Sequence, residues 1–465
     1  MSGDASTQRV GAFARLFPPP SAQLCRRRDC AIRRALAPAA FLDIPSMNSA
    51  LPTPDNPHPG MGFRQFVGLI AMMMATNAIA IDSMLPSLPE IGRALNIDTA
   101  NHTQLIITSY LLGFGAAQIV YGPLADRFGR RSVLLVGMVI YTLASLGAAF
   151  AGSFEVMMMA RALQGIGAAA TRILAVAIVR DCYSGRQMAR VMSLSFIVFL
   201  AVPVIAPSIG QLIVLVAPWR AIFGMLLIFG SVLITWILLR LPETLHPDDR
   251  IPISYRGISY AFGLVLRSRI SMGYMFAMTM IMSGLFAFIT SAQQVFSVVF
   301  DAAGLFTVIF AGIALFMAMS SFLNARIVER LGMRRVSHAA LLGYLAVTCI
   351  HAILVVLGYE TLLLFSLLQA VTMFFFGLVV SNFNAMAMEP VGHVAGTASS
   401  LLGFTTTIGG AVIGSSLGQM FDGTTLPLTV GFAAFGVAAL GFVLFAEHGR
   451  LFGSSAHFGG EVVRK

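Results

Sequence analysis

Long apolar runs separated by short polar breaks make up most of this chain after about residue 64. A helix of about 20 apolar residues crosses a hydrocarbon core of about 30 Å, and it satisfies its own backbone hydrogen bonds in lipid. The pattern therefore predicts an all-α membrane protein with twelve transmembrane helices. The twelve runs lie at about 64–86, 103–124, 132–151, 156–178, 190–215, 219–240, 270–292, 304–326, 336–357, 361–385, 395–420 and 427–447.

A longer polar stretch, 241–269, divides these helices into two sets of six. Within it, 254–266 are expected to form a short amphipathic helix on the membrane surface. The segments 122–131 and 324–335 occupy the same position in the two sets, between the second and third helices. We therefore predict two pseudo-repeated six-helix bundles at 61–240 and 270–448, a central loop at 241–269 and a tail at 449–465.

Residues 1–60 differ from the rest because they are basic and interrupted by proline, as at Pro18–Pro20 and Arg26–Arg28. Such a segment cannot build a hydrophobic core, and it lacks the long apolar core of a secretory signal. We expect a dispensable, disordered extension. Two alternatives remain open, namely a translation start at Met47 or Met61, and contact of the basic tail with anionic lipid.

The composition fits a membrane protein, with 11% charged residues against about 25% in soluble domains. The net charge of +10 comes from arginines in alternate loops, so it does not indicate nucleic-acid binding. Because cytoplasmic loops carry the excess of arginine, both termini are expected in the cytoplasm. The inner loops hold Arg127, Arg130, Arg131, Arg180, Arg186, Arg190, Arg240, Arg250, Arg256, Arg267, Arg269, Arg326, Arg330, Arg334 and Arg335, and the outer loops hold only Arg93 and Arg220.

The segment Gly122–Arg131 places an acid, three arginines and two glycines in one short gap between helices. A loop that is merely basic would explain its arginines but not Asp126, Gly122 and Gly129 at fixed offsets. The segment resembles the cytoplasmic loop signature of the major facilitator superfamily, G-x-L-A-D-R-x-G-R-R. That resemblance implies the major facilitator fold, in which two helix bundles rock around a central site.

The resemblance also implies a contact between the second and eleventh helices that closes the cytoplasmic side. Asp126 is expected to accept hydrogen bonds from the start of the eleventh helix, where the positive end of the helix dipole points. Arg127 and Arg131 are expected to add ionic ties, and Arg130 completes the motif. In the eleventh helix, glycines spaced four residues apart predict a flat packing stripe; they are Gly410, Gly414 and Gly418.

Asp82 is the acid that lies well inside a predicted helix. An ionised carboxylate there costs about 2.5–3.5 kcal/mol, so we expect it to face a cavity or a cation and to load and release a proton. A helix-end acid that reaches interfacial water is the alternative. Arg161 lies at a similar depth, about 10 Å from the same face at 1.5 Å per residue. We expect the two to pair, since each lowers the burial cost of the other; an arginine that snorkels outward is the alternative.

Two further motifs support the resemblance. Arg161, Gln164, Gly165 and Gly167 resemble the fourth-helix signature R-x-x-Q-G-x-G, whose arginine takes part in proton transfer in proton-driven members. Pro203, Pro207 and Gly210 resemble the antiporter signature of the fifth helix, where proline kinks the helix and small residues allow close approach. By resemblance this kinked helix seals the cavity against proton leak, although kinks also occur for packing alone.

Several polar side chains in predicted helices are candidates for the substrate cavity. Arg172 is three turns beyond Arg161 on nearly the same face, where the superfamily usually has a small residue. It either reaches the cytoplasmic interface or shifts substrate preference toward anions. The uncharged candidates, all in the second half, are Gln293, Gln294, Gln369, Asn382 and Asn384.

Four markers resemble the Bcr/CflA subfamily of drug:proton antiporters: A-I-D-S-M-L-P-S-L-P at 80–89, A-I-V-R-D at 177–181, P-E-T-L at 242–245 and A-G-T-A-S-S-L-L-G at 395–403. The resemblance implies a monomeric efflux carrier of the bacterial inner membrane that exchanges small amphipathic drugs for protons. Export of an amino acid or thiol metabolite is the alternative, and a non-transporting receptor is a more distant one. No cysteine, histidine or acid cluster has metal-ligand spacing, so we expect no metal, no cofactor beyond the proton gradient and no enzymatic activity.

Overall fold

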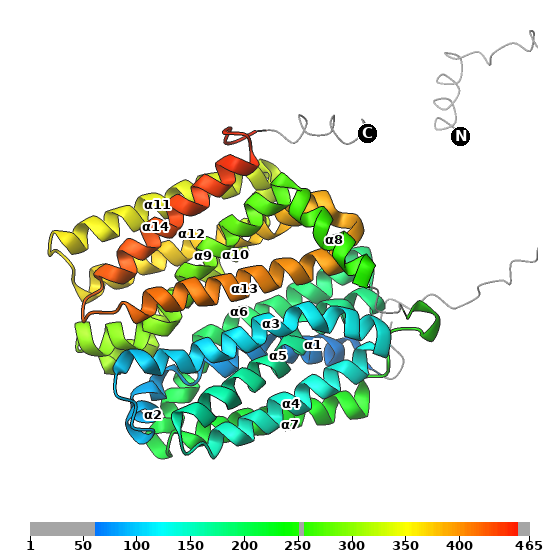
Figure 1. The fold of residues 1–465 in the computed structure, drawn as a ribbon, viewed down its shortest axis with the longest axis horizontal. Helices are drawn as coiled ribbons and strands as arrows, with labels where there is room; N and C mark the ends of the chain where they lie inside the picture. Colours follow the sequence, from blue (N-terminus) through cyan, green and yellow to red (C-terminus); the bar gives the residue numbers. More distant parts are fainter. Residues whose placement is uncertain (1–60, 251–254, 454–465) are drawn as a thin grey trace, which may run out of the picture. The chain divides into compact units, whose positions relative to one another are not determined.

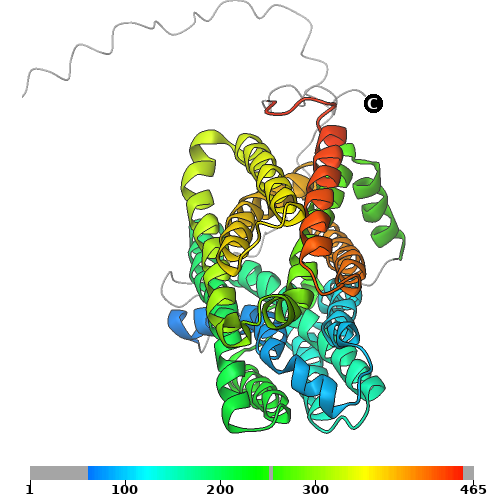
Figure 2. The ribbon, with the colours of Figure 1, turned by 90° about the vertical axis from the view of Figure 1, so that its left-hand side faces the viewer.

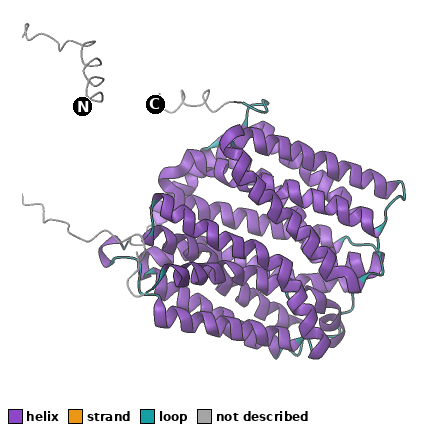
Figure 3. Cartoon of the chain, turned by 180° about the vertical axis from the view of Figure 1, so that it is seen from behind, coloured by secondary structure: helices purple, strands orange, loops and turns teal. Residues whose placement is uncertain are grey.

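The computed structural model describes residues 61–250 and 255–453, so the predicted tail at 1–60 lies outside the described residues. Within the described ranges, 12 helices are long and apolar enough to cross a membrane, and helix dominates the cartoon in Figure 3. The predicted number of transmembrane helices is therefore confirmed.

The transmembrane helices of the first half are α1 (Phe63–Asp82), α3 (Leu105–Phe128), α4 (Arg130–Ala149), α5 (Phe154–Cys182), α6 (Gly185–Val216) and α7 (Arg220–Arg240). Those of the second half are α9 (Arg269–Gln294), α10 (Phe306–Leu331), α11 (Met333–Val356), α12 (Leu362–Met388), α13 (Ala395–Gln419) and α14 (Leu426–Ala446). Between the halves, α8 (Tyr255–Arg267) buries Ala261 and Val265 and exposes its arginines. That pattern confirms the predicted amphipathic helix.

The first helix differs from its predicted course. It ends at Asp82 rather than at residue 86, and a 3₁₀ turn at Leu85–Ser87 leads into α2 (Leu88–Ala94). Pro86 lies in that turn, and a proline cannot donate the backbone hydrogen bond that would continue an α-helix. Asp82 therefore lies at a helix end inside the apolar span 63–94, not in the middle of a continuous helix.

The corner between α3 and α4 is tighter than a loop. Gly129 alone separates the two helices, and its φ of 93° lies in a region that favours glycine. A Cβ atom at this position would also meet the Glu243 carboxylate. In the second half, Gly332 separates α10 from α11 with a φ of 82°, so the predicted repeat is present in the backbone.

The two halves meet along two seams. One joins α3 to α13, and the other joins α6 to α10; Figure 1 shows α3 and α13 side by side. The predicted contact between the second and eleventh helices is thus confirmed. Figure 2 shows the blue-to-teal helices of the first half and the yellow-to-red helices of the second half as two groups.

Candidate functional site

Asp82 is buried at the point where α1 meets α6. Its side chain is 5% exposed, and within the described residues it forms no hydrogen bond or ion pair. The next residue, Ser83, donates a hydrogen bond to the Ile79 carbonyl at 2.7 Å. A Cβ atom on Gly210 of α6 would collide with the Ser83 carbonyl oxygen. Glycine at 210 therefore allows α6 to touch α1 directly beside the buried acid.

The two prolines of the fifth-helix motif lie inside an uninterrupted helix. Pro203 and Pro207 are both within α6, which runs from Gly185 to Val216. Each proline removes one backbone hydrogen bond, so successive turns of α6 are weakened just before Gly210. The motif therefore joins a deformable stretch of helix to a close contact with α1.

Arg161 is fully buried but does not pair with Asp82. Its guanidinium lies 4.5 Å from the centre of the Tyr110 ring, and Nη1 donates to Gln164 Oε1 at 2.5 Å. Nε donates to the Ile106 carbonyl at 3.4 Å, and Nη2 has no partner. The predicted ion pair between Asp82 and Arg161 was therefore wrong for this state. Arg161 points toward α3, where the Tyr110 ring and carbonyl oxygens stabilise its positive charge.

Tyr110 of α3 contacts Arg161 and was missed in the sequence. The centre of its ring lies 4.5 Å from the Arg161 guanidinium, and its hydroxyl group is buried without a hydrogen-bond partner. The available signal was a tyrosine inside an apolar run near the depth of Asp82 and Arg161. Tyr110 and Arg161 therefore form a buried cation–π pair between α3 and α5.

The remaining residues of the fourth-helix motif fix α5 against its neighbours. Gln164 donates to the Ser145 hydroxyl of α4 at 2.7 Å. A Cβ atom on Gly165 would collide with the Tyr110 carbonyl of α3, and one on Gly167 would lie 2.5 Å from the Gly137 carbonyl of α4. The two glycines thus set the position of the helix that carries Arg161.

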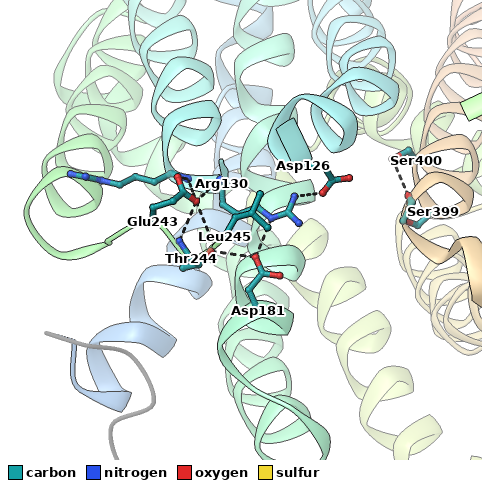
Figure 4. A network of polar contacts seen from close by, with 10 residues as sticks. Asp126, Arg130, Asp181, Glu243, Thr244, Leu245, Ser399 and Ser400 are labelled. Carbon is teal, nitrogen blue, oxygen red and sulfur yellow. Dashed lines mark hydrogen bonds and ion pairs between the residues drawn. The ribbon is translucent and has the colours of Figure 1, made fainter. Parts of the chain in front are cut away.

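The signature segment forms an ionic network within the first half (Figure 4). Arg130 is 4% exposed; it donates to Asp126 at 2.5 Å and to Asp181 of α5 at 3.1 Å. The Glu243 carboxylate, after α7, accepts the Arg130 backbone N–H at 2.7 Å. These contacts join the corner between α3 and α4 to the ends of α5 and α7. We call this the signature end of the molecule.

The predicted closing contact with α13 is not formed in this state. The side chain of Asp126 is 43% exposed, and Figure 4 shows no dashed line from it to Ser399 or Ser400 of α13. Arg127 lies over the Phe128 ring, and Arg131 donates to the Leu238 carbonyl at 2.8 Å. The expected ionic ties from Arg127 and Arg131 were therefore wrong. Gly122 does approach α13, since a Cβ there would lie 3.1 Å from Ser400 Oγ.

The halves are instead tied at the opposite end, which Asn101, Gln104, Gln294 and Gln419 define. Asn101 donates to the Gln419 carbonyl at 3.1 Å and accepts from Gln294 at 3.2 Å. Gln104 donates to Gln294 and to the Gly418 carbonyl, the latter at 3.1 Å. All four side chains are amides at the interface between the halves, with Gln104 and Gln294 buried and Asn101 and Gln419 half-buried, so this polar seam stabilises closure of the opposite end.

A second ionic network repeats the first in the other half. Arg334 donates to Glu447 at 2.8 Å and lies 3.5 Å from Glu389, and Tyr274 donates to Glu447 at 2.7 Å. Glu389 follows α12 and Glu447 follows α14, as Asp181 ends α5 and Glu243 follows α7. In each half, one arginine at the corner between two helices therefore contacts acids at the ends of two other helices.

The uncharged cavity candidates have different positions. Gln294 belongs to the polar seam, and Asn382 donates to Asn324 at 2.8 Å within the second half. Both are buried, and their place in a substrate cavity stays a prediction. Gln369 is buried with an unpartnered amide nitrogen. Gln293 is half-buried, and Asn384 is exposed on α12.

Arg172 is exposed on α5 although it lies far from the helix end. Ten residues separate it from Cys182, where α5 ends, which corresponds to about 15 Å. It forms no hydrogen bond or ion pair with any described residue. The main packing partners of α5 are α3 and α4, and those of α12 are α10 and α11. Arg172 and Asn384 are thus exposed polar groups on membrane-spanning helices, and their role in the substrate cavity stays a prediction.

The glycine stripe of α13 packs within its own half. A Cβ on Gly410 would meet Phe286 of α9, and one on Gly414 would lie 2.5 Å from the Ser283 carbonyl of α9. Only Gly418 faces the first half, against Gln104. The predicted packing stripe is confirmed, but most of it serves α9 rather than the seam with α3.

This arrangement defines a class: a polytopic membrane carrier made of two repeated six-helix halves with a buried carboxyl group between helices. The Major Facilitator Superfamily model matches residues 68–414. The chain belongs to this superfamily and, as its motifs predict, to the Bcr/CflA group.

Relatives and solved structures agree. The chain is 30% identical over 367 residues to a bicyclomycin resistance protein homolog of Haemophilus influenzae, covering 78% of this chain and 91% of that protein. It is 29% identical over 356 residues to multidrug resistance protein D of Escherichia coli, covering 75% and 86%. A partially occluded inward-open conformation of the E. coli xylose transporter XylE shares the fold, with a TM-score of 0.66 at 11% identity over 84% of this chain and 99% of that one.

Proposed function

We propose that this chain exports small amphipathic drugs, of the bicyclomycin or chloramphenicol kind, in exchange for protons. The names of its relatives support the substrate class. The observation that carries proton coupling is Asp82, a buried carboxyl group without a hydrogen-bond partner among the described residues. It lies beside the contact between Gly210 and Ser83, so a change in the charge of Asp82 would affect the packing of α1 against α6.

The proposed cycle follows from the cost of that buried charge. An ionised carboxylate in a membrane helix costs about 2.5–3.5 kcal/mol, which corresponds to on the order of 100-fold in an equilibrium. Protonation of Asp82 removes this cost and favours the state that is closed at the opposite end. Substrate binding and release of the proton then favour the alternative state, so the two halves alternate access to the central site.

We further propose that the protein lies in the bacterial inner membrane with its signature end and both termini in the cytoplasm. The excess of arginine at the signature end supports this orientation. We propose that it works as a monomer, without metal or cofactor and without enzymatic activity. The proton gradient would then supply all of the energy for transport.

The test replaces Asp82 with asparagine in proteoliposomes under an imposed pH gradient. Drug-driven proton movement is followed with a pH-sensitive dye, against a panel of chloramphenicol-like, bicyclomycin-like and cysteine-like compounds. We expect the Asp82→Asn variant to bind drug but to lose drug-driven proton exchange. Undiminished exchange would remove Asp82 from the mechanism, and exchange driven only by the cysteine-like compound would reassign the substrate.

Asp422→Asn is the matched control. Asp422 lies in the exposed loop before α14, where hydrogen bonds from the Thr424 hydroxyl and backbone hold the pKa of its carboxyl below the usual range. It therefore stays ionised at physiological pH and has no proton to exchange. The same substitution at this position should leave drug-driven proton exchange unchanged.

A further inference from the structure

A groove runs along the outer face of the first half, between α1 and α7. Its volume is about 620 Å³, and its lining residues are Gln65 of α1 and residues of α7 between Leu227 and Arg240. On α7 these residues recur in adjacent pairs every four positions, so they form one helix face. The groove therefore follows the axis of α7.

Trp236 forms the wall of this groove next to α1. A Cβ atom on Gly68 would lie 3.3 Å from the Trp236 ring, so glycine lets the indole lie directly against the α1 backbone. Ser231 and Thr235 donate their hydroxyl hydrogens to carbonyls one turn earlier, both at 2.8 Å. The groove surface is consequently apolar along its length, with a fixed aromatic ring near one end.

The signature end of the groove carries a positive charge that no acid neutralises. Arg240 is exposed and forms no hydrogen bond or ion pair within the described part of the chain. Glu243, the nearest acid in sequence, is already occupied by the backbone N–H groups of Arg130 at 2.7 Å and Leu245 at 3.2 Å. Arg64, next to Gln65, is exposed at the same end.

The dimensions match one lipid chain. Arg240 lies thirteen positions after Leu227, which is about 20 Å along a helix and about two thirds of a hydrocarbon core of about 30 Å. A second groove, of about 550 Å³ between α3 and α4, contains no charged residue among its lining side chains. The arginine therefore distinguishes the α1–α7 groove from an ordinary lipid-facing hollow.

We propose that the α1–α7 groove is a binding site for an anionic phospholipid, with the phosphate group at Arg240 and one acyl chain along α7 against Trp236. A basic side chain at the membrane surface attracts anionic lipid, and the groove holds the chain in place. From the attraction of a single arginine we expect about a fivefold preference for anionic over zwitterionic lipid. This proposal does not depend on the drug-export function.

Tryptophan fluorescence gives a direct test because the chain has only 2 tryptophans. Trp219 is 2% exposed and lies at the other end of α7, so the Trp219→Phe variant leaves Trp236 as the single reporter. This variant is placed in nanodiscs that contain equal small fractions of phosphatidylglycerol or phosphatidylcholine with brominated acyl chains. We expect phosphatidylglycerol to quench Trp236 at about a fifth of the mole fraction that phosphatidylcholine requires.

Substitutions at Arg240 separate charge recognition from simple lipid contact. In the Trp219→Phe background, Arg240→Gln should abolish the preference, and Arg240→Lys should retain it. Arg330→Gln, which removes an exposed arginine at the signature end of α10, should leave the preference unchanged. Equal quenching by both lipids in the Trp219→Phe protein, or a preference that persists in Arg240→Gln, would overturn the proposal.

Discussion

Replacing Gln104 with alanine tests whether the polar seam at the opposite end holds the two halves in the state seen here. Its Nε2 donates to the Gly418 carbonyl at 3.1 Å and to Gln294, both in the second half. Each buried hydrogen bond contributes about 0.5–1.5 kcal/mol, so losing both destabilises this state by about 1–3 kcal/mol. Because 1.4 kcal/mol is a factor of ten, we expect a shift of about 5–150-fold toward the state that is open at this end.

Spin-label distances measure that shift at both ends of the molecule. In a cysteine-free background, labels at Phe150 and Tyr359 report on the opposite end, where these side chains are 80% and 67% exposed. Labels at Phe128 and Leu331, 50% and 53% exposed, report on the signature end. In Gln104→Ala we expect the first distance to lengthen and the second to shorten, because alternating access couples them.

The control removes a buried amide whose contacts stay within one half. Asn382 donates to Asn324 and to the Leu378 carbonyl, both at 2.8 Å and both in the second half. Asn382→Ala should lower stability without changing either distance. Unchanged distances in Gln104→Ala, or equal changes in Asn382→Ala, would refute the assignment of the seam as the element that selects this state.

Three further substitutions probe the other contacts. Gly210→Ala places a Cβ against the Ser83 carbonyl; such overpacking costs about 1–3 kcal/mol, and we expect a lower melting temperature together with faster proton leak in liposomes without drug. Arg130→Gln removes two hydrogen bonds to carboxylates, each of which contributes about 1.5–3 kcal/mol. It should therefore lower the melting temperature more than Arg127→Gln, because Arg127 contacts only the exposed Phe128 ring. Arg172→Gln should slow transport of anionic substrates relative to cationic ones, and an equal effect on both would separate Arg172 from substrate recognition.

The helices could be predicted from the sequence because every membrane span is under the same physical constraint. Each apolar run had to form a helix to satisfy its backbone, and the observed helices begin and end within a few residues of the predicted runs. The exception is the first helix, which ends at Asp82 instead of residue 86. Pro86 lies in the 3₁₀ turn that follows, and the apolar run alone did not show where the α-helix would stop. The glycines were also informative, since Gly129 and Gly332 both adopt a positive φ at equivalent corners.

The contacts between the two halves could not be predicted from the sequence in the same way. The motif around Asp126 indicated which helices meet, and α3 does meet α13. Whether Asp126 touches α13 depends on which of two states the protein adopts, and one sequence encodes both. Asn101 and Gln104 carried no recognisable motif, although they make the buried polar contacts that tie the halves together here.

Asp82 and Arg161 illustrate the difference between depth and direction. A rise of 1.5 Å per residue predicts the depth of each side chain in the membrane, and both are buried. A pair also requires two helices to turn the correct faces toward each other, and a change of one residue rotates that face by about 100°. In this structure α1 and α5 do pack on each other, but Arg161 faces α3, where the centre of the Tyr110 ring lies 4.5 Å from its guanidinium. The ion pair therefore failed on direction and not on depth, since the fully buried arginine directs its charge to the aromatic ring and to the Ile106 and Gln164 oxygens.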